Sequence, residues 1–210
     1  MSLVKSEFKS EPFLWIHLAG LAAVPIWLEL GWLGLATGSP LLPVPLEVGI
    51  VALVGGALPA GMQLVRPFYI FSIPGLILRA GQLAKSQRQI LRQLYDRRNY
   101  LIILAVPLVW AVIVWQLYRL APLVSRLSPL PASWHVVGLA IAIGAFTLAN
   151  LMTQVPLAVL QVLLTPEAEL AALEPYPTAE IAQDFTRLGW PVDRIPFVPT
   201  PLATDEGVEG

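Results

Sequence analysis

The sequence predicts an all-α polytopic membrane protein with four transmembrane helices. Hydrophobic residues make up 56% of the 210 residues, charged residues make up only 13%, and the mean hydropathy is +0.69. A soluble domain has about a quarter of its residues charged, because its surface must face water. Four apolar stretches are also long enough to cross a hydrocarbon core, which takes about 20 helical residues. Lipid therefore replaces water around most of this chain.

The four predicted spans cover residues 12–36, 42–65, 101–120 and 134–164. The first span is much longer than the apolar core of a signal peptide, which has about 7 to 15 residues. We therefore expect it to stay in the mature protein. The turn Thr-Gly-Ser-Pro separates the first two spans and makes them a tight helical hairpin.

The distribution of Lys and Arg predicts the orientation, because these residues gather on the cytoplasmic side. Lys5 and Lys9 precede the first span, and only Arg119 and Arg126 lie around the loop between the last two. The other basic residues before residue 165 lie in the loop 66–100 between the second and third spans: Arg66, Arg79, Lys85, Arg88, Arg92, Arg97 and Arg98. The sequence thus predicts a cytoplasmic arm (residues 1–11), a membrane domain (12–164) with a cytoplasmic loop, and a cytoplasmic tail (165–210).

The loop between the second and third spans has two predicted parts. Residues 67–78 are apolar but would be only about 18 Å long as a helix, so we expect an interfacial segment. A Ser-x-x-Gln capping pattern at residues 86–89 then begins a basic helix. The arginines expected to bind a partner or anionic headgroups are Arg88, Arg92, Arg97 and Arg98. The alternative is a solvated end of the third span.

The tail from residue 165 is acidic and rich in proline. Thr165, Pro166 and Glu167 form the start pattern of a short helix, and Thr178 is placed to begin a second one. We expect a small appendage to the membrane domain rather than a second globular domain.

Ionisable residues inside spans are candidates for function, because burying a charge in lipid is costly. Glu29 and Glu47 lie at similar depth near the outer ends of the first two spans, where the hairpin turn could bring them together. They would then form a buried acid pair that holds a cation or relays a proton. His135, Arg119 and Tyr118 could reach the same level. The alternative is that both acids lie among headgroups or pair with Arg119.

Polar residues in the fourth span lie on one helix face, since Thr147, Asn150 and Gln154 follow each other at spacings of three and four. They could bind a partner helix or a lipid, or hydrogen-bond within the bundle. Small residues four apart, such as Ala140 and Gly144, would let a neighbouring helix approach closely.

The sequence contains no motif for catalysis or metal binding. It has no Cys, only two His residues, and no P-loop, GxSxG or HExxH pattern. His17 and His135 lie near opposite ends of their spans, so they cannot ligate one haem within a subunit. His17 is the candidate for binding a cofactor such as chlorophyll, although hydrogen bonding at the interface is the favoured role. We therefore expect no enzyme, no resident cofactor and no metal.

Four stretches together resemble the cyanobacterial family of low-complexity tail membrane proteins: FKSEPFLWIHLAGLAAVPIWLEL, LLPVPLEVGIVALVG, RPFYIFS and AEIAQDFTRLGWPVDRI. The resemblance covers nearly the whole chain. It implies a thylakoid protein with an auxiliary role in photosystem II biogenesis, and it brings no catalytic motif. The tail of this chain is short and only modestly low in complexity, so a role that needs a long tail does not carry over.

Two functions follow from the sequence. The first is a non-enzymatic membrane scaffold or assembly factor in the thylakoid or plasma membrane, which binds lipids and transmembrane partners such as photosystem subunits. Chlorophyll or carotenoid would then be present only through a partner, and nucleic acid is not expected. The alternative is a small transporter that moves protons or cations with Glu29 and Glu47.

Overall fold

Four helices in the structure are long and apolar enough to cross a membrane, which confirms the predicted fold class. The computed structural model describes residues 8–96, 100–196, 198 and 199. Its candidate spans are Pro12–Leu35, Val44–Val65, Tyr100–Leu127 and Ala132–Leu164. Their bounds lie close to the predicted ones, except that the third helix continues several residues further.

The first span is not one continuous α-helix. It consists of α1 (Pro12–Ala19), a 3₁₀ turn (Gly20–Ala23) and α2 (Val24–Leu35). Pro25 lies in the first turn of α2, where its missing N–H costs nothing because the first helical N–H groups have no partner within the helix. The tighter turn before Pro25 therefore divides the span into two helices.

The other three spans are each a single α-helix, and two of them have a short 3₁₀ turn at one end. They are α3 (Val44–Val65), α5 (Tyr100–Val124), which continues into a 3₁₀ turn, and α6 (His135–Leu164), which follows one. Each contains a proline in its interior: Pro59 in α3, Pro107 and Pro122 in α5, and Pro156 in α6. Interior prolines are tolerated in membrane helices where another group bonds the freed carbonyl.

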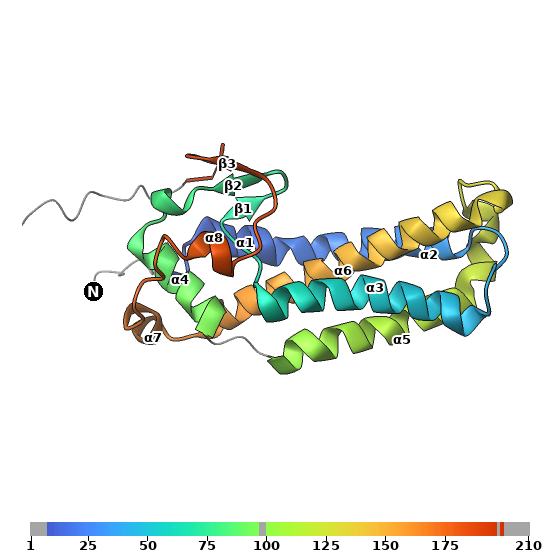
Figure 1. Cartoon of the computed structure of the whole chain (residues 1–210), viewed down its shortest axis with the longest axis horizontal. Helices are drawn as coiled ribbons and strands as arrows, with labels where there is room; N and C mark the ends of the chain where they lie inside the picture. Colours follow the sequence, from blue (N-terminus) through green and yellow to red (C-terminus); the bar gives the residue numbers. More distant parts are fainter. Residues whose placement is uncertain (1–7, 97–99, 197, 200–210) are drawn as a thin grey trace, which may run out of the picture. The chain divides into compact units, whose positions relative to one another are not determined.

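The helices contribute to a compact bundle unit formed by residues 19–64 and 100–154. In it α2, α3, α5 and α6 run alongside one another (Figure 1). Its core is apolar and includes Val51, Val114 and Phe146, all at most 2% exposed. Gly34 and Gly138 let α2 and α6 touch through their backbones, since a Cβ on Gly34 would lie 2.5 Å from the Gly138 carbonyl oxygen. The small residues of α6 thus serve packing within the unit at this level.

A small three-stranded sheet was not predicted from the sequence. Strand β1 (Ser72–Ile73) pairs antiparallel with β2 (Leu76–Leu78), and β2 pairs parallel with β3 (Trp190–Val192) from the tail. Pro74 and Gly75 form the turn of the hairpin, and Gly75 has φ +85°, the left-handed region that a type II turn requires at this position. The predicted interfacial segment therefore contains a β-hairpin.

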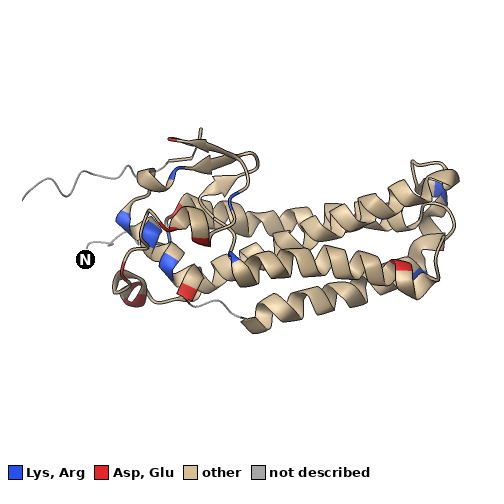
Figure 2. Cartoon of the chain, in the orientation of Figure 1, with Lys and Arg blue, Asp and Glu red and all other residues tan. Residues whose placement is uncertain are grey.

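The loop and the tail belong to one compact unit, here called the sheet unit, which also includes the start of the first span. Its described residues are 8–18, 65–96 and 155–199 without 197. It contains the sheet and the short helices α4 (Lys85–Asp96), α7 (Glu167–Ala171) and α8 (Ile181–Asp184). Charged residues are concentrated on these elements, whereas most turns of the long helices carry none (Figure 2). The described part of the tail, residues 165–199 without 197, is therefore part of a packed unit.

Aromatic rings connect the segments of the sheet unit. Phe13 of α1 meets Phe71 edge to face at 5.5 Å between ring centroids, and Tyr69 meets both Phe71 and Phe185 of the tail. Phe185 also packs against Tyr176 and Tyr95, which continues the row to α4. Such pairs add to the apolar area that each ring buries. Burial raises the pKa of the Tyr176 phenol above its usual value, and the nearby Asp184 acts in the same direction.

Candidate functional site

A buried ion-pairing site lies at the end of the bundle unit that carries the α2–α3 turn and the α5–α6 loop. Glu47, in the first turn of α3, and His135, the first residue of α6, are 2% and 6% exposed. His135 Nε2 lies 2.9 Å from Glu47 Oε2. The other carboxylate oxygen, Oε1, accepts the backbone N–H groups of Leu41 and Leu42 at 2.7 and 2.9 Å.

One hydrogen must lie between the two side chains. The Thr37 carbonyl oxygen, 2.6 Å from His135 Nδ1, can only accept, so Nδ1 carries a hydrogen. The contact between Nε2 and Oε2 then needs a second hydrogen, held either by an imidazolium facing a carboxylate or by a carboxylic acid facing a neutral imidazole. In both arrangements the pair holds one transferable proton.

The site is tied to both neighbouring connections. Thr37 Oγ1 donates to the Leu33 carbonyl at 3.0 Å and accepts from Ser128 Oγ at 2.8 Å. Gly38, at φ +71°, lets the α2–α3 turn pass the α5–α6 connection, since a Cβ there would lie 2.2 Å from the Ala132 carbonyl oxygen. The hydrogen bonds of the pair therefore fasten the hairpin turn to the start of α6.

An open pocket of about 270 Å³ lies beside His135 and is also lined by Tyr118 and Ser125. No group of three or more His, Asp or Glu side chains that could hold a metal occurs among the described residues.

The predicted acid pair is wrong, because Glu29 is exposed whereas Glu47 is buried and bonded to His135. Glu29 lies on a face of α2 that the bundle leaves open. Arg119 is exposed as well, and its guanidinium donates to Gln116 one turn away rather than to an acid. The sequence indicated that His135 could reach the level of the two acids, and in the structure it contacts Glu47.

Asn150 and Gln154 do not face outward, contrary to their prediction as partner-binding residues. They are 0% and 3% exposed, and Gln154 Nε2 donates to Asn150 Oδ1 at 2.8 Å. Asn150 Nδ2 in turn donates to the Gly55 carbonyl of α3 at 3.3 Å. Thr147 bonds back to the Ile143 carbonyl of its own helix. The polar face of α6 thus serves internal packing, the alternative that the spacing left open.

The basic helix predicted to bind partners contacts the chain's own tail. Arg92 lies 4.9 Å from the centre of the Tyr176 ring, donates to the Glu174 carbonyl at 3.4 Å and is near Asp96. Arg88 is half-buried, and its backbone carbonyl accepts the Tyr176 N–H at 3.1 Å. Arg97 and Arg98 lie outside the described residues.

Buried glutamines of α4 were missed from the sequence, since a polar helix face is normally read as solvated. Gln89 Nε2 donates to the Ala171 and Leu173 carbonyls at the end of α7, at 3.0 and 2.8 Å. Gln93 Nε2 donates to Thr165 Oγ1, and Gln87 Nε2 donates to Glu11 Oε2. Carbonyls at the end of a helix lack partners within that helix, so Gln89 acts as a cap supplied from another element.

His17 makes the hydrogen bond that its position favours. Its Nε2 donates to the Ile70 carbonyl at 2.6 Å, and its ring packs edge to face against Phe68.

No curated protein and no solved structure matches this chain. A family described as low-complexity tail membrane protein-like matches residues 10–197, a range that includes the ion-pairing site and most of the sheet unit. The match confirms the family that the four sequence stretches predicted. The chain therefore belongs to the low-complexity tail membrane protein-like family.

Proposed function

We propose that this protein is a non-enzymatic membrane scaffold or assembly factor that holds transmembrane helices of a partner protein. The observation that carries the proposal is an open face of α6. Ala140 and Gly144 are exposed, and a Cβ on Gly144 would meet nothing within 4 Å. Small residues four apart leave room for another helix backbone to approach closely.

The sheet unit offers a second surface that could contact a partner protein. Leu188 and Trp190, beside and within β3, are 56% and 78% exposed. Large apolar side chains that lie together on a surface are typical of an interaction site. The positive-inside rule supports a cytoplasmic location for this unit and for both chain ends. The resemblance noted above supports the thylakoid membrane and photosystem subunits as partners.

A substitution in the open face provides the test. Gly144→Leu fills space outside the bundle, so the fold should persist while a partner helix is displaced. A tagged full-length chain purified in mild detergent should recover photosystem subunits or assembly factors, and Gly144→Leu should lose most of that recovery. Gly49→Leu is the matched control, because a Cβ on Gly49 also meets nothing within 4 Å. Recovery of the bait alone with the unmodified chain would contradict the proposal.

A second candidate function is proton or cation transport, which is favoured by the buried Glu47–His135 pair and its open pocket. The packing of the bundle unit, all of whose residues are described, counts against it. Val51, Trp110 and Phe146 close the core beyond the pair, and the packing gap that they line beside Gly55 has no room for a water molecule. Proteoliposomes would decide between the two functions: flux that Glu47→Gln abolishes would support transport, and no flux from the unmodified protein would eliminate it.

A further inference from the structure

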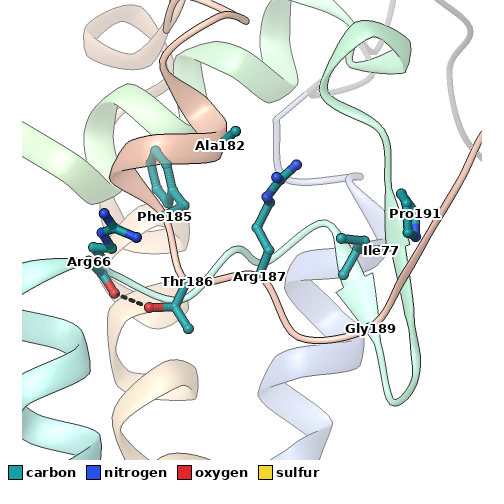
Figure 3. Close-up of a pocket in the computed structure, with 8 residues that line it drawn as sticks. All are labelled: Arg66, Ile77, Ala182, Phe185, Thr186, Arg187, Gly189 and Pro191. Carbon is teal, nitrogen blue, oxygen red and sulfur yellow. Dashed lines mark hydrogen bonds between the residues drawn. The ribbon is translucent and has the colours of Figure 1, made fainter.

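We propose that the sheet unit contains a binding site for a tetrahedral oxyanion, the phosphate of an anionic lipid headgroup, between Arg66 and Arg187. A pocket of about 410 Å³ is lined by both arginines, and no Asp or Glu is among its lining residues. The other walls come from β2, α8 and the start of β3 (Figure 3).

Backbone pairing brings the segment that carries Arg187 alongside the segment that begins at Arg66, although 120 positions separate Arg66 from Thr186. Thr186 donates its N–H to the Pro67 carbonyl at 2.9 Å, and its own carbonyl accepts the Tyr69 N–H at 3.0 Å. The Thr186 hydroxyl donates to the Arg66 carbonyl at 2.8 Å. In Figure 3 the Thr186 side chain lies on one side of the paired backbones, and the guanidinium groups of Arg66 and Arg187 both extend to the other side. The tail therefore brings a second arginine to the first.

Both side chains are available for a ligand. Arg66 and Arg187 are exposed, and neither guanidinium makes a hydrogen bond or ion pair with any residue that the structure describes. Nearby acids are engaged elsewhere, since Asp193 pairs with Arg79 at 2.8 Å and Asp184 accepts the Tyr176 hydroxyl at 2.6 Å. Two unneutralised arginines in one pocket favour an anion.

The shape of guanidinium favours phosphate among anions. Its planar set of N–H groups can donate two parallel hydrogen bonds to a phosphate, which a lysine ammonium cannot do. Phe185 and Ile77 are 2% and 4% exposed and give the pocket an apolar floor. A lipid has both parts, a charged phosphate diester and an apolar body, whereas inorganic phosphate has only the first.

The position of Arg66 in the chain identifies lipid as the source. Arg66 follows Val65, the last residue of a candidate span, so its guanidinium lies where the hydrocarbon region gives way to headgroups. An anionic phospholipid at that level can bring its phosphate to the pocket without leaving the membrane, and its net negative charge matches the two arginines, whereas the choline of a zwitterionic lipid adds a positive charge beside them.

The test uses the full chain in a neutral detergent with three probes: phosphatidylglycerol, phosphatidylcholine and inorganic phosphate. Native mass spectrometry counts the lipids that stay bound, and thermal unfolding reports stabilisation. We expect saturable binding of phosphatidylglycerol, weakened by about tenfold or more in Arg66→Gln and in Arg187→Gln, since a hydrogen bond to a charged group contributes that much. Arg126→Gln, which removes an exposed arginine of the bundle unit, is the matched control.

Each outcome has one meaning. Binding of phosphatidylglycerol that depends on Arg66 and Arg187 supports the lipid site, and equal dependence for inorganic phosphate supports an oxyanion site that is filled from solution. Equal retention of phosphatidylcholine and phosphatidylglycerol would overturn the proposal. Unchanged binding in the double variant Arg66→Gln/Arg187→Gln, with circular dichroism like that of Arg126→Gln, would overturn it as well.

Discussion

Asn150 replaces a hydrogen-bond donor that α3 lacks. Its side-chain nitrogen lies 3.3 Å from the Gly55 carbonyl oxygen, which in an uninterrupted helix would accept the N–H of residue 59. Residue 59 is a proline and has no N–H. The proline in one helix and the asparagine in another therefore compensate each other inside the bundle.

A double-mutant cycle tests this relationship. Asn150→Leu should destabilise the unmodified protein by about 1 to 2 kcal/mol, because it leaves a buried carbonyl without a donor. Pro59→Ala restores the backbone N–H, so Asn150→Leu should cost less in that background. Reversible unfolding in detergent measures both values. Equal costs in the two backgrounds would show that the amide and the proline are independent.

The Glu47–His135 pair should tolerate an amide but not an apolar side chain. In Glu47→Gln, the amide oxygen can still accept from Leu41 and Leu42 while its NH₂ donates to a neutral imidazole. Glu47→Leu leaves the Leu41 and Leu42 N–H groups and His135 Nε2 without partners, and His135→Leu leaves a buried carboxylate with its histidine partner removed. We expect little loss of stability for the first variant and about 3 kcal/mol or more for His135→Leu. Thermal unfolding of the purified variants measures the order of their stabilities. A Glu47→Gln variant as unstable as Glu47→Leu would refute this prediction.

Gln89 should control the docking of the tail. Gln89→Glu places a carboxylate against the Ala171 and Leu173 carbonyls, which cannot donate to it. We expect the tail from residue 165 to become sensitive to protease several-fold sooner than in the unmodified chain. Gln183→Glu, which adds the same charge on an exposed position of α8, is the control. Identical cleavage rates for the two variants would mean that the Gln89 cap does not hold the tail.

Glu11 should make the stability of the sheet unit depend on pH. Burial raises the pKa of this carboxyl above its ordinary value, and the donors Gln87 and Phe13 offset only part of that effect. The folded state then binds the proton more tightly than the unfolded state, so stability is greatest below the unfolded pKa and falls as pH rises through the folded pKa. The slope within that window approaches about 1.4 kcal/mol per pH unit.

Unfolding of the full chain between pH 4 and pH 8 checks the Glu11 prediction. Glu11→Gln should flatten the curve, whereas Glu180→Gln, at an exposed position, should leave its shape unchanged. A curve that rises with pH in the unmodified protein, and that Glu11→Gln does not change, would show that the sign is wrong.

The spans could be predicted because each depends on local composition. A run of about 20 apolar residues forms a transmembrane helix in lipid. The Thr-Gly-Ser-Pro sequence ends such a run because its Gly and Pro favour a turn. The sequence also indicated that His135 could reach the level of Glu47, since both lie near the ends of their helices, but it did not identify the two as a pair. The expectation for Glu29 was wrong because the position of a residue along a helix does not say which side of that helix faces the core.

The sheet and the tail contacts could not be predicted in this way. Strands of two or three residues are too short to show alternation, although the Pro74–Gly75 pair does mark the turn between β1 and β2. The pairing of β2 with β3 joins segments more than 110 positions apart, which no local pattern encodes. Gln87, Gln89 and Gln93 look like a solvated surface until the carbonyls that they cap are in place.

The parallel pairing of β2 with β3 sets an order for biosynthesis. The described part of the sheet unit begins at residue 8, yet its third strand ends at Val192. Hairpin β1–β2 and helix α4 leave the ribosome long before Phe185, Thr186 and Trp190 exist to cover them. Contacts between such distant segments form late, because the intervening chain must first be closed into a loop. During that interval Tyr69 has no Phe185 ring against which to pack, so one side of its ring stays uncovered until the tail segment that carries Phe185 has been made.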